Sequence, residues 1–174
     1  MQHNSIRSQL EQYHNDCYGW ALHCCYQDRE MAHEVLQTSY LKILERQNLF
    51  AGRSEFKTWA FTIIKNKAID AFRKKRREIN LFRTQDHFPD IFYDEGTENV
   101  YDLNLPKSFF NEALGRLSER QRQLLQLVFY HDLSLNQSAK ILNISQGSVR
   151  KHYDRAKKIL APWFQKKGIV KSQL

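Results

Sequence analysis

Glycine and proline are scarce in this chain of 174 residues, which contains six of the first and three of the second. Segments in which apolar and polar residues alternate are also few. Hairpins need both features, because tight turns use glycine or proline and half-buried strands alternate with a period of two. The two shortages leave little room for strands and predict an all-α fold.

Long apolar runs are absent as well. No segment approaches the roughly 20 apolar residues that span a bilayer as a helix. The first residues, MQHNSIRSQLEQ, lack the apolar core of a secretion signal. We therefore expect a cytoplasmic protein with no stable membrane insertion.

Only three cysteines occur, an odd number that argues against a framework of disulfides. Histidines surround them, so zinc is conceivable; the cluster is His14, Cys17, His23, Cys24, Cys25 and His33. The spacings are not those of a C-x-x-C or H-x-x-x-H site, and adjacent residues such as Cys24 and Cys25 point about 100° apart on a helix. Free cysteine often behaves as a small buried apolar residue. We expect no metal and no cofactor, with metal binding or redox sensing as the minor alternative.

Charge is biased to one sign. The chain has 27 Lys and Arg against 19 Asp and Glu, a net charge of +8 and a pI of about 9.4. Such a balance favours a polyanionic partner, most often nucleic acid. Paired carboxylates, a nucleophile with its base and a phosphate-binding glycine loop are not evident, so we do not expect an enzyme.

The stretch from Ser54 to Arg77 joins an apolar stripe to a cationic run. The stripe recurs at helical gaps of three and four and contains Phe56, Trp59, Ala60, Ile63, Ile64, Ala68 and Phe72. The other angles carry Lys57, Lys65, Asn66, Lys67, Asp70 and Arg73, and five consecutive cations follow, from Arg73 to Arg77. Ser54 is the expected N-cap. For this stretch alone, nucleic-acid binding and a merely solvated helix end are about equally well supported.

Two helices are predicted before this stretch. Residues 6–26 carry a stripe of Leu10, Tyr13, Cys17, Trp20, Ala21 and Cys24. Asp28 is the expected cap of a helix that runs to about Gln47. Its stripe contains Met31, Val35, Leu36, Tyr40, Leu41 and Leu44. Three helices make a first domain, which we place at residues 1–79.

The helical pattern disappears between residues 80 and 106. This segment contains Pro89, Gly96 and Pro106, and its acidic residues, opposed by Arg83, are Asp86, Asp90, Asp94, Glu95, Glu98 and Asp102. The composition favours an extended acidic linker. Its aromatic residues favour docking of parts of it onto another surface, and a plain flexible tether is the alternative.

Residues 107–174 form a second predicted helical domain. Ser118 with Gln121, and Ser134 with Gln137, each fit a capping box. Asn143 and Ile144 predict a tight turn, after which Ser145 caps a last helix that Pro162 ends. The apolar side of that helix contains Val149, Tyr153, Ala156, Ile159 and Leu160. Two short helices joined by a turn, the second of them basic, form a helix-turn-helix whose second helix fits the major groove.

The last helix has the stronger cationic bias. From Ser148 to Leu174, eight Lys or Arg oppose Asp154 alone. Residues near the start of such a helix meet base edges, and later cations meet phosphates. The predicted DNA contacts are Ser145, Gln146, Ser148, Arg150, Lys151, His152, Arg155 and Lys158. Some trihelical units of this kind bind protein instead.

These residues carry a resemblance to the bacterial RNA polymerase sigma factors of the extracytoplasmic function (ECF) group, over nearly the whole chain. AHEVLQTSYLK, from Ala32 to Lys42, resembles the family's acidic, apolar, Gln, aromatic and basic pattern. Residues 50–77 resemble the loop and helix of region 2 that recognise the promoter −10 element. Residues 117–127 and 133–160 resemble region 4, which recognises the −35 element. The order of helical domain, acidic linker and helix-turn-helix matches too.

The resemblance implies three binding surfaces and several partners. Core polymerase would be met at its β′ clamp helices and β flap, with the clamp contacts at Glu34, Gln37, Tyr40 and Lys42. The −10 contacts would be Phe50, Gly52, Arg53, Ser54, Lys65, Asn66, Asp70, Arg73 and Lys74, with a flipped base held by the loop at residues 50–55. We expect Trp59 to pack in the core rather than separate strands. An anti-sigma factor is also implied, which would hold the chain at the inner membrane if it is anchored there.

Departures from the family limit what is transferred. Glu34 stands where the family usually has Asp, and Lys151 with His152 replaces the commoner Ser-Arg pair, so the −35 sequence is not predicted. The two other classes to weigh are a free-standing helix-turn-helix activator, which would bind duplex DNA without polymerase, and a nucleic-acid-processing enzyme. The scattered acids of the linker suit the second poorly.

Overall fold

The computed structural model describes residues 6–47, 50, 55–82 and 115–166. Every regular element in these ranges is a helix, which confirms the all-α prediction. The elements are α1 (Ile6–Gln12), α2 (His14–Cys24), α3 (Arg29–Glu45), α4 (Phe56–Phe82), α6 (Glu119–Leu125), the π-helix η2 (Gln126–Tyr130), α7 (Leu135–Leu142) and α8 (Gln146–Lys166). They fall into two compact units, Met1–Val100 (unit 1) and Tyr101–Leu174 (unit 2). Most of the predicted linker lies outside the described residues, and the predicted domain boundaries stay predictions.

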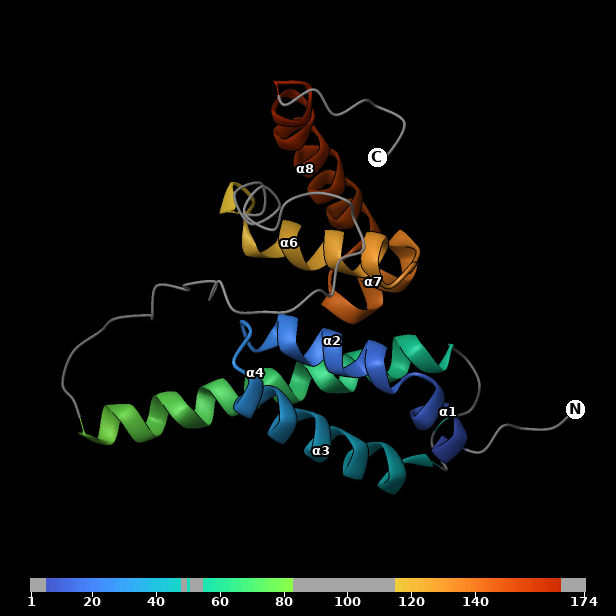
Figure 1. Cartoon of the computed structure of the whole chain (residues 1–174), viewed down its shortest axis with the longest axis vertical. Coiled ribbons are helices and arrows are strands. Elements are labelled where there is room, and N and C mark those ends of the chain that lie inside the picture. Colours follow the sequence, from blue (N-terminus) through green and yellow to red (C-terminus); the bar gives the residue numbers. More distant parts are fainter. Residues whose placement is uncertain (1–5, 48–49, 51–54, 83–114, 167–174) are drawn as a thin grey trace, which may run out of the picture. The chain divides into compact units, whose positions relative to one another are not determined.

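In unit 1, α2, α3 and α4 pack against one another (Figure 1). Trp20 and Phe61 are fully buried, and their rings stack with centroids 5.6 Å apart. The Trp20 Nε1–H donates to the Phe61 carbonyl oxygen at 3.1 Å, so the indole is buried without leaving its donor unpaired. Ile43 and Ile64 complete the centre of this core.

The first helix is broken, where the sequence predicted one helix from residue 6 to residue 26. α1 ends at Gln12 and α2 begins at His14, with Tyr13 between them at φ −101° and ψ 15°. The Tyr13 ring stacks on Phe56 of α4, 6.0 Å between centroids. The bend occurs at the residue that makes this contact. The contact joins two distant parts of the chain, so the apolar pattern of residues 6–26 alone could not predict it. The prediction of an unbroken helix is wrong.

α3 begins where predicted, and Met31, Val35 and Leu36 of its predicted stripe are buried as expected. The Asp28 carboxylate accepts from the Met31 amide at 3.0 Å, which confirms the cap. Leu41, predicted in the apolar stripe, is 62% exposed, so that prediction is wrong. The buried side is centred on Ala32, Ser39 and Ile43. Ser39 tolerates burial because its hydroxyl donates to the Val35 carbonyl at 2.6 Å.

Unit 2 has short helices with well-defined ends. Both predicted capping boxes form: Ser118 with Gln121 begins α6, and Ser134 with Gln137 begins α7. Asn143 ends α7 in the left-handed region at φ 53°, as the tight turn requires. After α6 the chain continues as the π-helix η2, which has a wider turn and which the sequence pattern did not indicate.

α8 packs Val149, Ala156 and Leu160 into the core of unit 2. Two expectations about it are wrong. Ile159, predicted inward, is 38% exposed, and the helix continues past Pro162 to Lys166. Proline has a helical φ, so the helix can continue through it, at the cost of a missing amide hydrogen bond and a clash of its ring with the carbonyl four residues back.

Candidate nucleic-acid interface

One side of α4 carries exposed polar residues in helical register. Asn66, Asp70 and Arg73 follow one another by four and three residues, and all three side chains are exposed. Arg73 Nη1 lies 3.7 Å from Asp70 Oδ1, so the two form an exposed ion pair along the helix. This side therefore offers an amide, a carboxylate and a guanidinium together, which can meet both base edges and phosphates.

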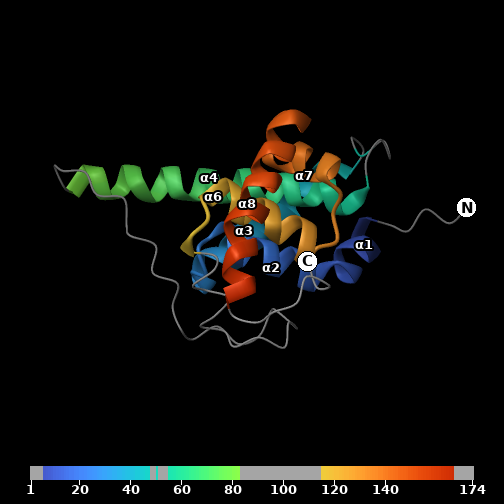
Figure 2. The same ribbon diagram turned by 90° about the horizontal axis from the view of Figure 1, so that it is seen from above.

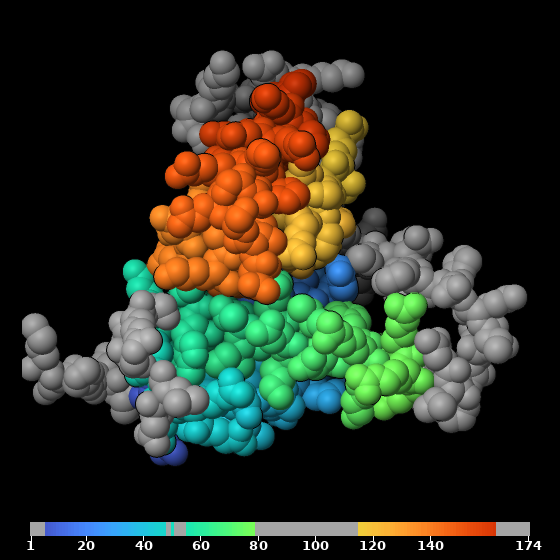
Figure 3. Space-filling model, turned by 180° about the vertical axis from the view of Figure 1, so that it is seen from behind, coloured from blue at the N-terminus to red at the C-terminus, as the bar shows by residue number. Residues whose placement is uncertain are grey.

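The cationic end of α4 is open to solvent. All five residues from Arg73 to Arg77 are exposed, Lys74 among them. Figures 1 and 2 show α4 running on past α2 and α3, and in the space-filling view its C-terminal end (light green) stands clear of them (Figure 3). Five adjacent cations on a projecting helix are an electrostatic footprint for a polyanion.

Lys65 does not lie where the sequence predicted. It was expected on the exposed side of α4, but it is only 8% exposed. It follows Phe61 by four residues and precedes Ala68 by three, both of which are buried, so it belongs to the buried line of the helix. A lysine stem of four methylenes tolerates such packing. The side chain is therefore not presented to DNA in this structure.

Aromatic rings cluster where the predicted base-holding loop meets α4. Phe50 stacks on Trp59 with centroids 4.9 Å apart, and Phe56 contacts both rings edge to face. Trp59 is half-buried in this cluster, which fits packing, while a role in strand separation stays untested. Three predicted loop contacts, Gly52, Arg53 and Ser54, lie outside the described residues.

The predicted polymerase surface is centred on α3. Glu34 and Gln37 are exposed, and Leu41 follows them at the next helical position on the same side. The spacing of residues 34, 37 and 41, three and four apart, could have shown that Leu41 shares this side. It was missed because Leu41 was assigned to the apolar stripe. Lys42 is the next residue after Leu41, and its Nζ lies 3.1 Å from Glu45 Oε2.

Tyr40, the fourth predicted polymerase contact, is half-buried and already bonded within the unit. Its hydroxyl lies 3.1 Å from His14 Nδ1 and also hydrogen-bonds the Cys17 thiol. Burial raises the pKa of Tyr40 above its ordinary value, and the neighbouring Cys17 raises it further. Tyr40 therefore braces α3 against the N-terminal helices more than it faces outward.

The three cysteines are buried thiols. Burial raises the pKa of Cys17 and that of Cys25 to about 12, so both remain protonated at neutral pH. Within the described residues, His, Cys, Asp and Glu side chains do not gather in groups of three or more that would hold a metal ion.

α8 presents its cations opposite the core of unit 2. Arg150, Lys151, Arg155 and Lys158 are exposed, as are Ser145 and Gln146, whereas Ser148 and His152 are half-buried. Ser148 is engaged in the helix cap: the Ser145 Oγ accepts from the Ser148 amide at 3.2 Å and donates to the Ser148 Oγ at 2.9 Å. Six of the eight predicted contacts are thus on the open surface.

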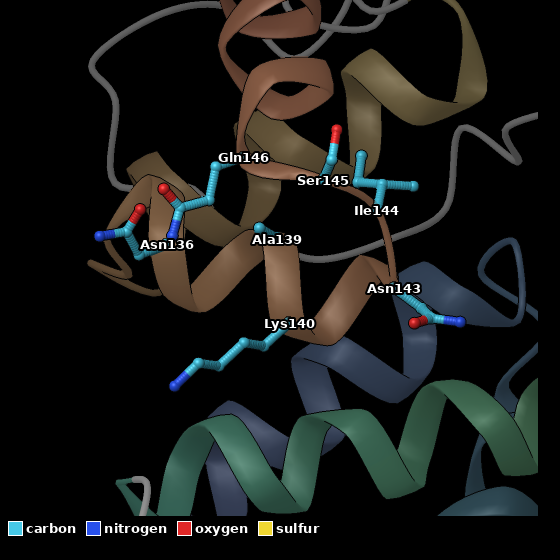
Figure 4. A pocket seen from close by; sticks show the side chains of 7 residues that line it. All are labelled: Asn136, Ala139, Lys140, Asn143, Ile144, Ser145 and Gln146. Atoms are coloured by element: carbon cyan, nitrogen blue, oxygen red, sulfur yellow. The ribbon is translucent and has the colours of Figure 1, made fainter.

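A groove of about 450 Å³ lies beside the turn between α7 and α8 (Figure 4). Its lining is Asn136, Ala139, Lys140, Asn143, Ile144, Ser145 and Gln146. The residues from α7 were not among the predicted DNA contacts. The available signal was Lys140, a cation in the last turn of the first helix of the motif.

No helix in the described part of the chain is long and apolar enough to cross a membrane.

Comparison with known proteins gives the same assignment for both units. Residues 10–78 match the Sigma-70 region 2 family, and residues 113–160 match Sigma-70 region 4. The chain is 30% identical over 159 residues to the ECF RNA polymerase sigma factor SigX of Bacillus subtilis, covering 85% of this chain and 77% of that protein. It is 30% identical over 129 residues to the ECF sigma factor RpoE of Cereibacter sphaeroides, covering 71% and 65%.

Two solved structures share the fold. Sigma factor RpoE from Bartonella quintana, in complex with the anti-sigma factor NepR, has a TM-score of 0.71 at 21% identity and covers 93% of this chain and 98% of its own. CnrH, in complex with the cytosolic domain of CnrY, has a TM-score of 0.60 at 16% identity and covers 94% and 90%. The matched regions and relatives show that this chain belongs to the ECF RNA polymerase sigma factors, which direct promoter-specific transcription initiation.

Proposed function

We propose that unit 1 reads and opens the −10 element through the exposed side of α4. Asn66 offers both a donor and an acceptor to a base edge, and Asp70 and Arg73 lie on the same side. The run from Arg73 to Arg77 supplies phosphate contacts nearby. A base flipped from the non-template strand loses a few kcal/mol of stacking, which hydrogen bonds and aromatic contacts in a pocket recover. The exposed Asn66 side of α4 is the observation that carries this proposal.

Unit 2 reads the −35 element with α8. The exposed residues at its start, Gln146 and Arg150, are placed to meet base edges, and Lys151, Arg155 and Lys158 follow as phosphate contacts. Because the cations are opposite the buried side of the helix, α8 can enter a major groove while its core contacts stay intact. The β flap of polymerase is the partner that we assign to this unit.

Core polymerase binds the exposed side of α3. Glu34 and Gln37 contact the β′ clamp helices. We assign Leu41 to the same interface, because it is 62% exposed and gives the polar surface an apolar centre. Apolar residues inside a polar rim often carry much of the affinity of an interface. We expect Leu41→Ala to weaken polymerase binding about tenfold with little effect on folding, because the side chain is exposed. Asn15→Ala, at an exposed position of α2, is the control, and equal effects would contradict this assignment.

The chemistry of RNA synthesis belongs to the polymerase, and this chain supplies specificity in the cytoplasm. One structural neighbour was solved in complex with an anti-sigma factor, and we infer that a partner of that kind also holds this chain inactive. An inhibitor anchored in the inner membrane would keep it there until release.

Reconstitution with core polymerase tests the function directly. The holoenzyme should start transcription at a defined promoter and protect its −10 and −35 elements in a footprint, and the chain alone should protect neither. Strong protection of duplex DNA by the free chain would instead favour a stand-alone helix-turn-helix activator. Turnover of nucleic acid without polymerase would favour an enzyme.

Asn66→Ala tests the −10 surface. A base-edge contact is worth about 1–3 kcal/mol of discrimination, so preference at one −10 position should fall roughly 5- to 150-fold. Gln12→Ala removes another exposed amide of unit 1 away from this surface and should change nothing. Unaltered −10 preference in the Asn66 variant would refute the assignment while leaving the function standing.

A further inference from the structure

The groove beside the α7–α8 turn is suited to the backbone of a DNA strand. Its apolar lining residues are Ala139 and Ile144, and the exposed residues around it are three amides, a hydroxyl and one ammonium. No carboxylate lines it. In Figure 4 the Asn136 and Gln146 side chains lie at the same end of the groove, and the Lys140 side chain extends beside them. Donors without an opposing acid are what a phosphate diester requires.

Gly147, the second residue of α8, adds an independent observation. By helical spacing it lies on the same side as Lys151 and Lys158, away from the buried Val149 and Ala156. A Cβ built at Gly147 would meet nothing within 4 Å, so packing inside the protein does not demand a glycine. Glycine weakens a helix relative to alanine. Neither packing within unit 2 nor helix propensity therefore explains a glycine at this exposed position.

We propose that this turn is a seat for one strand of the −35 duplex, in which Lys140 of α7 binds a backbone phosphate and Gly147 gives the leading end of α8 clearance in the major groove. The inference rests on the proposed −35 binding and adds two residues to it. Lys140 fixes where the strand lies, and Gly147 sets how deep the helix sits. Together they place Gln146 and Arg150 against the bases that these residues read.

The Gly147→Ala holoenzyme tests the clearance, with promoter affinity and thermal unfolding as its two readouts. The methyl group should strengthen α8, so the midpoint of thermal unfolding should be equal to or above that of the original chain. Promoter affinity should nevertheless fall by about tenfold, because a raised helix loses base contacts. Gly115→Ala is the matched control, since Gly115 is also exposed with nothing within 4 Å of a built Cβ. Unchanged affinity, or a lowered unfolding midpoint, would overturn the role of Gly147.

Lys140→Ala tests the phosphate contact in the same holoenzyme. Binding should weaken several-fold on every promoter sequence, and the slope of log affinity against log salt should flatten by about 0.9. Neutral methylphosphonates placed singly along the −35 strands should mimic the variant at one phosphate, where the two changes together should cost no more than either alone. Arg116→Ala removes the same charge from unit 2 outside the groove and should be additive with every methylphosphonate.

The outcomes separate the two levels of the argument. If the original holoenzyme fails to protect the −35 element, the proposed function fails and this inference fails with it. If protection is normal and Lys140→Ala is additive at every phosphate, or keeps the full salt slope, only the seat is wrong.

Discussion

The two units specify their helices by different means. In unit 2, α6 and α7 have seven and eight residues, each begins with a Ser/Gln capping box, and α7 ends at a left-handed Asn143. In unit 1, α3 and α4 have 17 and 27 residues and are held by contacts between residues far apart in sequence, such as Trp20 with Phe61. The short helices α6 and α7 therefore begin at local signals, whereas the long α4 is held by long-range packing.

The units also differ in how they carry charge. The five cations of α4 are consecutive and exposed, whereas the cations of α8 alternate with residues that form the core. Substitutions at the end of α4 should therefore hardly change the stability of unit 1. In α8, a substitution at one position should affect DNA binding and a substitution at the next should affect core packing.

The largest effect is expected from Trp20→Ala. Removing a fully buried indole and leaving a cavity should destabilise unit 1 by about 3–5 kcal/mol. Trp20 packs within unit 1, which is a separate compact unit, so the stability of unit 2 should not change. Hydrogen exchange followed by mass spectrometry at neutral pH reports each unit through its own peptides.

Val149→Ala is the reciprocal change, because Val149 is fully buried in unit 2. It should lower amide protection in unit 2 and spare unit 1. If Trp20→Ala reduced protection equally in both units, their folding would be coupled and the comparison would fail.

A smaller effect is expected from alkaline pH, and only in unit 1. An unfolded thiol ionises near pH 9, but Cys17 and Cys25 have a pKa of about 12 when folded. A raised folded pKa contributes stability that is complete below pH 9 and is lost as the pH rises toward 12. Each thiol should then cost unit 1 about 1 kcal/mol between pH 7 and pH 10. The raised pKa of Tyr40 acts in the same direction.

Urea unfolding at the two pH values measures this loss. Tryptophan fluorescence in a Trp163→Phe background confines the signal to unit 1, since Trp20 and Trp59 are then the remaining tryptophans. Cys25→Ala should flatten the pH dependence by about one thiol's share. A unit 1 equally stable at pH 7 and pH 10 would show that these thiols are not desolvated as the structure indicates.

Ser134→Ala should cost unit 2 about 1 kcal/mol, because the serine hydroxyl accepts from the Gln137 amide at the start of α7. Ser134→Asp retains an acceptor at the cap and should recover most of the loss. Chemical unfolding followed by circular dichroism measures both variants. A change well below 0.5 kcal/mol would mean that packing rather than the capping box sets the end of this helix.

Sequence reasoning worked best where structure is local. Ser118, Ser134, Asp28 and Asn143 were predicted as helix ends because caps and left-handed turns depend on a few neighbouring residues. It failed at Tyr13 and at the π-helix, where the backbone adjusts to packing from elsewhere. In η2 the His131 amide bonds the Gln126 carbonyl five residues back, a register that no three-and-four pattern contains.

The candidate site shows the same division. A periodic stripe tells which side of a helix is apolar but not the angle at which that side meets its neighbours. The predicted boundary of the apolar side was wrong at three positions. Lys65 is buried, and Leu41 and Ile159 are exposed. Asn66 and Asp70 follow the half-buried Trp59 and Ile63 by seven residues, so they lie at the edge of the stripe. Their polar side chains, more than the period, predicted their exposure, and the exposure of the α8 cations was predicted correctly as well.

The smallest effect is expected from Lys75→Ala. Lys75 Nζ lies 3.6 Å from Asp28 Oδ2, and the two side chains are 57% and 41% exposed, so the pair is a surface ion pair worth less than about 0.5 kcal/mol. Asp28→Ala should cost more, about 1 kcal/mol, because Asp28 also caps α3. A double-mutant cycle on unit 1 separates the pair from the cap. A coupling above about 1 kcal/mol would mean that the basic end of α4 is anchored to the bundle rather than free for DNA, and the contrast with α8 would then disappear.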